Sequence, residues 1–251
     1  MRKITLSGDA VYKGSLILVN SGHPCREAAC EVPLVPVDDK NPAALLERQS
    51  ARLLDKLMDE TGVRGKIVAV SGWRSESEQI RIYEDSLAEN GREFTQKYVA
   101  MPGCSEHQTG LAIDLAENKP DIDFIRPDFP YEGICRRFRE KASAFGFVER
   151  YPKGREDVTG IGWEPWHFRY VGFPHAAIMQ QQGMTLEEYH AFLKKHEYGI
   201  NPFVYRINGR RIEISYLKSG KDGTSSLEVN DDVLCMVSGN NMDGFIITVW
   251  W

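Results

Sequence analysis

The amino-acid sequence predicts a mixed α+β domain over residues 1–198, followed by a small β-rich appendage over residues 199–251. In the longer, N-terminal region, segments with apolar residues at helical spacing alternate with short apolar runs that are typical of strands. After about residue 200 the chain consists of short strand-like runs separated by turns such as SGKDG and NNMDG. This change in the sequence pattern indicates two regions of different architecture.

The first predicted helix covers residues 41–62. Asn41 is a favourable N-cap, Pro42 suits the first helical position, and Gly62 stands where a helix would end. The apolar residues of this segment would form its buried face: Leu46, Leu53, Leu54, Leu57 and Met58. A short buried strand is expected next, at residues 66–70.

The second predicted helix begins at Ser75, because Ser75 and Glu78 have the spacing of a capping box. We expect this helix to end at Gly91. Residues 111–115 are predicted to form a strand, and the proline- and aspartate-rich residues 116–131 a loop. Later helices are expected around residues 134–146 and from the second capping box, formed by Thr185 and Glu188.

Composition excludes several classes of protein. The net charge of −5, with no basic patch, argues against a nucleic-acid surface. The N-terminal residues lack the basic start and long apolar run of a signal peptide, and no segment has the length of a membrane helix, so we expect a cytoplasmic protein. Five cysteines without C-x-x-C spacing indicate reduced thiols, with a metal or disulfide pair of Cys25 and Cys30 as the alternative.

A carboxylate inside an apolar run draws attention to residues 105–115, SEHQTGLAIDL. Asp114 lies in a predicted strand, where an unpaired charge is costly. A divalent cation would compensate this charge, and hydrolytic zinc sites take three protein ligands and leave one position for water. His107, Asp114 and His167 would supply such a set, whereas we expect structural roles for His175, His190 and His196.

Glu164 is the candidate general base, because it lies three residues before His167 in the segment EPWH. Pro165 disfavours a helix at this point, and residues three apart on a regular strand face opposite sides. We therefore expect a bend or bulge here, near Gly160 and Gly162, that turns both side chains into one cleft.

Arg74 stands at the junction between the predicted strand and the helix that begins at Ser75. A guanidinium beside a positive helix N-terminus is suited to receive a carboxylate or a developing oxyanion. The alternative for Arg74 is an ordinary ion pair on the surface.

These segments together resemble the zinc D,D-peptidases of the VanX/VanY kind. The pattern S-x-H-x-x-G-x-A-x-D matches Ser105, His107, Gly110, Ala112 and Asp114, with SGWRS upstream and EPWH downstream. The segments PGCSEHQTGLAIDL, TGIGWEPWHFRYVG and TLEEYH are most similar to the bifunctional VanXY branch of vancomycin resistance. The resemblance covers most of residues 10–196, and the strand-rich tail is similar to that of VanG-type VanXY proteins. It implies a mainly antiparallel sheet with flanking helices, as in hedgehog-like folds.

The resemblance also implies one zinc ion bound by His107, Asp114 and His167, with Glu164 as catalytic base. Arg74 would polarise the scissile carbonyl. Gln79 and Ser105 match positions that hold the peptide and its terminal carboxylate, with helix-surface and turn-capping roles as their alternatives. Trp73 stands where relatives often carry tyrosine, and Trp163 is at a variable position before the glutamate; both bear on the shape of the cleft and not on the ligand set.

The implied reaction is hydrolysis of D-Ala-D-Ala, both as the free dipeptide and at the end of the cytoplasmic peptidoglycan precursor pentapeptide. The alternatives are an L,D-carboxypeptidase with the same metal set and a cell-wall-precursor binding protein without turnover. The loop at residues 116–131 is a candidate lid over the cleft. Trp250 and Trp251 suggest either a homodimer or partner surface, or packing onto the main domain.

Overall fold

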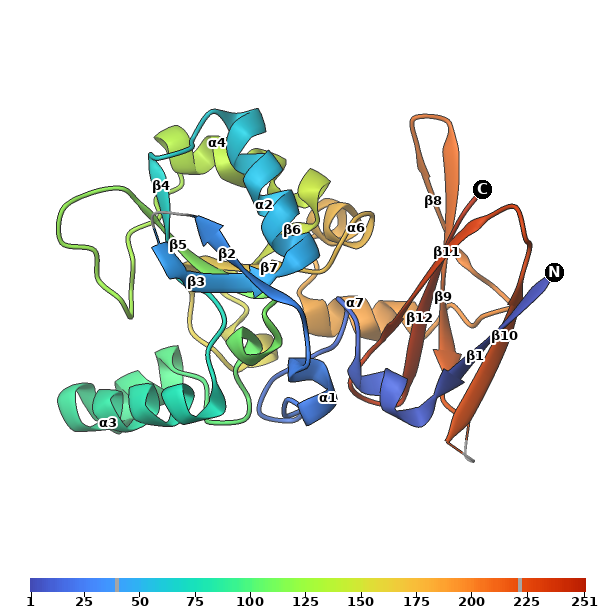
Figure 1. Cartoon of the computed structure of the whole chain (residues 1–251), viewed down its shortest axis with the longest axis horizontal. Coiled ribbons are helices and arrows are strands. Elements are labelled where there is room, and N and C mark those ends of the chain that lie inside the picture. Colours follow the sequence, from blue (N-terminus) through green and yellow to red (C-terminus); the bar gives the residue numbers. More distant parts are fainter. Residues whose placement is uncertain (39–40, 221–222) are drawn as a thin grey trace. The chain divides into compact units, whose positions relative to one another are not determined.

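The computed structural model describes residues 1–38, 41–220 and 223–251, which form two compact units. One unit is Val19–Thr185, and the other combines Met1–Leu18 with Leu186–Trp251. The first carries a four-stranded antiparallel sheet with helices, and the second is mostly β-structure (Figure 1). The predicted α+β fold with additional C-terminal strands is therefore confirmed.

The sheet of the first unit has the strand order β4-β5-β7-β6, and every neighbouring pair is antiparallel. Its strands are β4 (Ile67–Ser71), β5 (Ala112–Glu117), β7 (Glu164–Tyr170) and β6 (Phe147–Tyr151). Phe168 of β7 packs edge-to-face on Phe129 and on Phe138 of α4 (Gly133–Ala142). Because side chains alternate along a strand, His167 faces away from this aromatic core.

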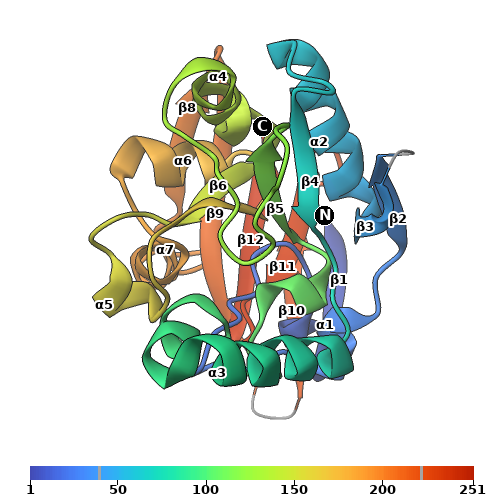
Figure 2. The same cartoon turned by 90° about the vertical axis from the view of Figure 1, so that its left-hand side faces the viewer.

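The remaining elements of this unit surround the sheet. They are α1 (Glu27–Cys30), the paired strands β2 (Leu34–Asp38) and β3 (Asn41–Glu47), α2 (Arg48–Thr61), α3 (Glu76–Tyr98), η2 (Glu106–Thr109), η3 (Ser143–Phe145), α5 (Glu156–Thr159) and α6 (His175–Gln182). In both views α2 and α4 lie near each other, whereas α3 lies at the opposite end of this unit (Figures 1 and 2).

The prediction of one helix over residues 41–62 is wrong in its first third. Residues 41–47 form β3, in which Ala44 and Leu46 are buried at the two-residue period of a strand. The helix begins at Arg48, where the side chain of Glu47 accepts hydrogen bonds from the amides of the first turn. Gly62 ends it in the left-handed conformation, as expected. Pairing with β2 thus outweighed the capping pattern at Asn41.

The helix predicted from Ser75 is confirmed at its start and longer than expected. Ser75 accepts a hydrogen bond from the amide of Glu78 at 3.2 Å. Gly91 does not end the helix but kinks it, with φ of 79° and ψ of 172°, and helical structure resumes as far as Tyr98. A buried hydrogen bond between the Ser86 and Thr95 hydroxyls at 2.8 Å joins the two segments across the kink.

The second unit contains η1 (Gly8–Tyr12) and α7 (Leu186–Leu193) in addition to its strands. The strands β8 (Phe203–Ile207), β9 (Arg210–Lys218), β11 (Leu234–Gly239) and β12 (Gly244–Trp250) form one sheet, in the order β11-β12-β9-β8. In a second sheet, β1 (Arg2–Ser7) pairs with β10 (Thr224–Val229). The N-terminal strand therefore belongs to this unit, which the sequence did not indicate. The division into a catalytic domain over residues 1–198 and an appendage over residues 199–251 stays a prediction.

Candidate active site

The register of β5 and β7 places Asp114 directly opposite His167. Cross-strand neighbours project from the same face of a sheet, so the two side chains meet, and Asp114 Oδ1 lies 2.9 Å from His167 Nδ1. His107 reaches the same carboxylate from η2, with its Nε2 atom 3.1 Å from Asp114 Oδ2. All three residues are buried.

The orientation of His107 is fixed by its second ring nitrogen. Nδ1 donates a hydrogen bond to the carbonyl of Gly72 at 2.6 Å, which leaves the lone pair on Nε2 directed at the cluster. Gly110 ends η2 in the left-handed conformation, where an added Cβ would lie 2.8 Å from Leu34 and 3.2 Å from the amide of Glu47. A glycine is therefore required to carry the chain from His107 into β5.

His107, Asp114 and His167 each offer one ligand atom, and these atoms lie within 4.8 Å of one another. Two imidazoles and one carboxylate are the donor set of hydrolytic zinc sites, with one position left open. The two histidines hold the pKa of Asp114 well below its ordinary value despite its burial, so this residue is a carboxylate. The residues thus fit a divalent metal ion, and no other such cluster exists among the described residues.

Glu164 opens β7 and reaches the same cluster, with Oε2 3.7 Å from His167 Nδ1. The expected irregularity is present, because the register of β6 and β7 shifts between Glu149 and Tyr151, opposite this segment. Arg139 donates a hydrogen bond to the carbonyl of Pro165 at 2.6 Å and so helps to hold the bend. Burial raises the pKa of Glu164 to about 8, and the negative charges of Asp114 and Glu106 act in the same direction.

Arg74 makes no surface ion pair, since its side chain is only 11% exposed and its partner is the buried Asp114. Nη2 donates to Asp114 Oδ2 at 2.9 Å, and Nε donates to the hydroxyl of Ser71 at 2.8 Å. The guanidinium therefore lies beside the potential metal ligands and lines the cleft.

Gln79 and Ser105 also lie at this cleft, and neither has the alternative role considered from the sequence. Gln79 is fully buried and not on a helix surface; its side chain donates to the carbonyl of Ala100 at 2.8 Å and accepts from Arg74 at 3.4 Å. Ser105 is buried before η2 without a side-chain capping bond. The structure thus brings together all seven residues selected from the sequence.

The cleft itself is small, with a volume of about 40 Å³. By the criterion of about 10–15 Å³ per water molecule, it has room for a few waters and not for a dipeptide. Phe124 and Ile125 of the loop at 116–131 line it, and the ring of Phe124 lies 5.6 Å from the guanidinium of Arg74. This loop therefore forms part of the wall of the cleft, and its role as a lid stays a prediction.

Sequence reasoning missed two residues that contact the cluster. The ring of Tyr151, from β6, lies 4.9 Å from that of His167. Glu106 is completely buried and faces His167 from the other side. Its only signal in the sequence is a charged residue between two motif positions, Ser105 and His107, which by itself does not distinguish a buried group from a solvated one.

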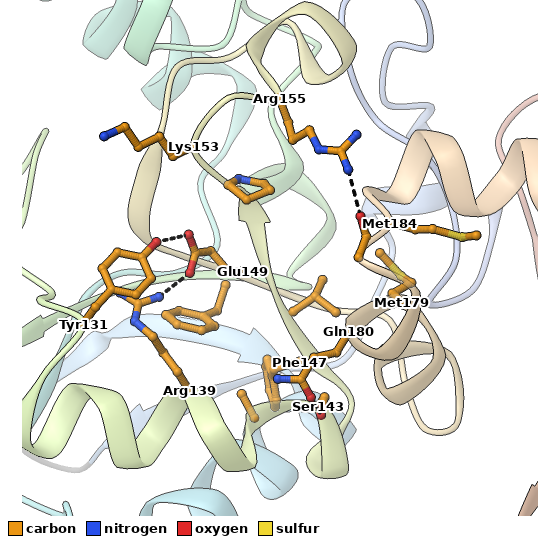
Figure 3. Close-up of a pocket in the computed structure, with 15 residues that line it drawn as sticks. Tyr131, Arg139, Ser143, Phe147, Glu149, Lys153, Arg155, Met179, Gln180 and Met184 are labelled. Carbon is orange, nitrogen blue, oxygen red and sulfur yellow. Dashed lines mark hydrogen bonds and ion pairs between the residues drawn. The ribbon is translucent and has the colours of Figure 1, made fainter.

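A second, larger cavity of about 370 Å³ lies among α4, β6 and α6 (Figure 3). None of the seven selected residues lines it. Glu149 accepts hydrogen bonds from Tyr131 and Arg139 at its wall, and Arg139 also binds the Pro165 carbonyl beside Glu164. Tyr131, Glu149 and Arg139 are thus paired with one another at the wall of the cavity. Through its bond to the Pro165 carbonyl, Arg139 also connects this wall to the strand segment that carries Glu164.

The other histidines and the described cysteine side chains take no part in the cluster. His190 and His196 each bond a backbone carbonyl, of Leu16 and Asn201 respectively. Among the described side chains, those of Cys104, Cys135 and Cys235 form no disulfide, and the reduced state of the cysteines stays a prediction. The side chain of Cys30, and with it the suggested pair with Cys25, lies outside the described residues.

Two observations bear on the expectations about partners and location. Trp251 is 54% exposed, and the centroid of its ring lies 5.9 Å from the Arg211 guanidinium. The expected homodimer stays a prediction. Among the described residues, no helix has both the length and the apolar character needed to cross a bilayer.

Comparison with known proteins agrees with this geometry. Residues 44–173 match the family model VanY, D-alanyl-D-alanine carboxypeptidase. The bifunctional D-Ala-D-Ala dipeptidase and carboxypeptidase VanXYC of Enterococcus gallinarum is 42% identical over 182 residues, which are 71% of this chain and 95% of that protein. A D-alanyl-D-alanine carboxypeptidase of Enterococcus faecium is 31% identical over 98% of this chain and 78% of that protein.

Solved structures show the same relationship. The vancomycin resistance D,D-dipeptidase VanXYg, in complex with a D-Ala-D-Ala phosphinate analogue, has a TM-score of 0.96 and 46% identity over 100% of this chain and 99% of that one. The VanB-type D,D-pentapeptidase VanY in complex with Zn(II) has a TM-score of 0.60 and 32% identity over 70% of this chain and 98% of that one. The chain therefore belongs to the VanY family of D-alanyl-D-alanine carboxypeptidases, a family of peptidases.

Proposed function

We propose that this protein is a zinc peptidase that hydrolyses D-Ala-D-Ala, both as the free dipeptide and at the end of the peptidoglycan precursor pentapeptide. The observation that carries the proposal is the convergence of His107, Asp114 and His167 with Glu164 and Arg74 in one buried cleft. The likeness over the whole chain to VanXYg, which was solved with a D-Ala-D-Ala analogue, supports the dipeptide as substrate. The protein would thereby contribute to vancomycin resistance.

In this proposal His107, Asp114 and His167 hold one zinc ion, which when bound would supply Lewis-acid polarisation of the scissile carbonyl and of a water molecule. Glu164 takes a proton from the attacking water and passes it to the departing D-alanine nitrogen. Its burial, which favours the protonated form, suits the second of these transfers. Arg74 donates to the oxygen of the scissile carbonyl, where negative charge develops in the transition state.

Ser105 and Gln79 complete the proposed site by holding the substrate. The hydroxyl of Ser105 is buried at the cleft and is assigned to the terminal carboxylate. Gln79 holds Arg74 through its side-chain oxygen and is assigned to the peptide backbone. The substrate precursors are made in the cytoplasm, and we therefore assign the protein to that compartment.

A second candidate is an L,D-carboxypeptidase, because the LdcB LD-carboxypeptidase has 32% identity and a TM-score of 0.59 over 69% of this chain. The two activities differ in the bond cleaved, so release of D-alanine from a tetrapeptide and a pentapeptide separates them. We expect release from the pentapeptide and the dipeptide. Release from the tetrapeptide alone would establish the second candidate.

Replacing Arg74 by alanine is expected to lower kcat for D-Ala-D-Ala by about 10²–10³-fold, the cost of losing one preorganised oxyanion donor. Bound zinc should be retained, because Arg74 contacts a ligand and is not one. Steady-state kinetics together with the zinc content measure both effects. Arg81→Ala, at an exposed position of α3, is the control and should keep normal turnover. Normal turnover by the Arg74 variant would remove this residue from the mechanism.

Replacing Phe124 by alanine is expected to shift preference toward the longer substrate. The Phe124 ring lies over the Arg74 guanidinium and is 44% exposed. We expect the loss of this contact to cost about 1 kcal/mol, which corresponds to about a fivefold decrease in kcat/KM for the dipeptide. The pentapeptide, which extends out of the cleft, should lose less. Ile122→Ala changes an exposed residue of the same loop that does not line the cleft. An equal loss for both substrates would show that the loop does not discriminate between them.

A further inference from the structure

Glu106 carries a charge that the chemistry described so far does not use. Its side chain is fully buried, and Oε1 accepts a hydrogen bond from Arg150 Nε at 2.8 Å and forms an ion pair with Arg169 Nη1 at 3.0 Å. Both arginine side chains are also fully buried. Burying three charges costs several kcal/mol per ion before their attraction offsets it, so such a cluster calls for a reason.

The second oxygen of Glu106 indicates that reason. Oε2 lies 3.6 Å from His167 Nε2. Both atoms are buried, and neither has a hydrogen-bond partner within the described residues. A buried donor or acceptor without a partner is rare, and here the two such atoms face each other.

The two nitrogens of His167 therefore face two carboxylates. Nδ1 points to Asp114, within the potential metal cluster, and Nε2 points to Glu106. A neutral imidazole that binds a metal through Nδ1 must carry its proton on Nε2, where it is a hydrogen-bond donor. Glu106 is an acceptor in the position to receive it.

We propose that Glu106 is a positioning residue, which accepts the Nε2–H of His167 and thereby fixes the tautomer and ring orientation of this ligand. The inference rests on the proposed metal site. Carboxylates that hold a ligating histidine in this manner raise its basicity and strengthen metal binding.

The strands explain why two arginines accompany Glu106. Arg169 lies two residues after His167 on β7 and so projects from the same face, and Arg150 comes from the neighbouring strand β6. Both arginines lie against Oε1, which leaves Oε2 for the histidine. The arginines thus keep Glu106 ionised and turned toward His167.

The other ligand histidine is held differently. His107 donates its Nδ1–H to the neutral carbonyl of Gly72. His167, in contrast, faces the negative charge of Glu106 through Nε2, the nitrogen that points away from the metal cluster. Removing the charge of Glu106 is therefore expected to weaken metal binding through His167 and not through His107.

The first test replaces Glu106 by glutamine, which keeps the shape and removes the charge. We expect the dissociation constant for zinc, measured by competition with a chromophoric chelator, to rise by about 10–100-fold. In the zinc-saturated variant kcat should fall with little change in KM. Glu117→Gln is the control, because it also removes the charge of a glutamate paired with a basic residue, but one that lies away from the cleft and faces no ligand histidine. Its zinc affinity should stay close to that of wild type. An unchanged zinc affinity in folded Glu106→Gln would overturn the proposal.

The second test uses the wild-type protein and does not depend on the folding of a variant. In the zinc-loaded protein, imidazole nitrogen NMR should show His167 protonated on Nε2, with a proton that exchanges slowly with water. A proton on Nδ1, or rapid exchange of the Nε2 proton, would contradict the hydrogen bond to Glu106. Both tests are independent of the substrate. A wild-type protein that binds zinc but releases no D-alanine would therefore contradict the proposed function without affecting this inference.

Discussion

Glu164→Gln is expected to lower kcat for D-Ala-D-Ala by about 10²–10⁴-fold, the usual contribution of a general acid–base group. The glutamine keeps the size of the side chain but cannot take a proton from water. Because Glu164 lies 3.7 Å from His167 Nδ1 without belonging to the three-residue ligand cluster, the variant should keep its zinc. Steady-state kinetics and elemental analysis of the same preparation measure the two quantities.

Glu117→Gln provides the control for this substitution. Glu117 ends β5, is partly exposed and pairs with Lys119, away from the cleft. This variant should hydrolyse D-Ala-D-Ala at the wild-type rate. If Glu164→Gln did so as well, Glu164 would not be the base, and the assignment of the chain as a peptidase would need another proton acceptor. If the wild type itself bound substrate without turnover, the alternative of a precursor-binding protein would gain support.

Asp114→Asn is expected to abolish stable zinc binding and, with it, hydrolysis. Asp114 is the residue that contacts both histidines and Arg74, so its charge organises the whole cluster. Removing one partner of a buried ion pair costs about 3–5 kcal/mol, because the other charge stays buried. We therefore expect less than one equivalent of zinc after dialysis and a lower free energy of unfolding.

The same control, Glu117→Gln, serves here because it lies on the same strand as Asp114, nearer its end. It should keep its zinc and most of its stability. An Asp114→Asn variant that held one zinc ion as tightly as wild type would show that the ligand set is wrong, whatever its activity.

The clustering of His107, Asp114 and His167 was predictable because it depends on features that can be read directly in the sequence. Asp114 is a charge in an apolar run, and His107 and His167 stand at fixed motif distances from it and from Glu164. The register that pairs Asp114 with His167 was not predictable, since it depends on contacts between strands far apart in the chain. The bend at Pro165 was expected, but its support by Arg139 was not.

The fold was predictable in its class and less so in its boundaries. Residues 41–47 carry good helix-capping signals and yet form a strand, because pairing with residues 34–38 decides their conformation. Gly91 kinks a helix that it was expected to end. The pairing of the N-terminal strand with residues 224–229 joins segments from opposite ends of the chain, for which local patterns hold no information.

Glu106 shows the same limit at the site. In the sequence it is one of 36 acidic residues, and nothing local marks it as buried. Only the fold brings Arg150 and Arg169 to one of its oxygens and His167 to the other. A residue that supports a metal ligand can thus lie inside the ligand motif and still be recognised only through partners that are distant in the chain.

Release of free D-alanine, from D-Ala-D-Ala and from the precursor pentapeptide, with and without a metal chelator, tests the central claim most directly. We expect the zinc-loaded protein to release D-alanine from both substrates, to stop after chelation, and to recover when zinc is restored. A zinc-loaded preparation that released D-alanine from neither substrate, or release that chelation left unchanged, would contradict the assignment of this protein as a zinc D,D-peptidase.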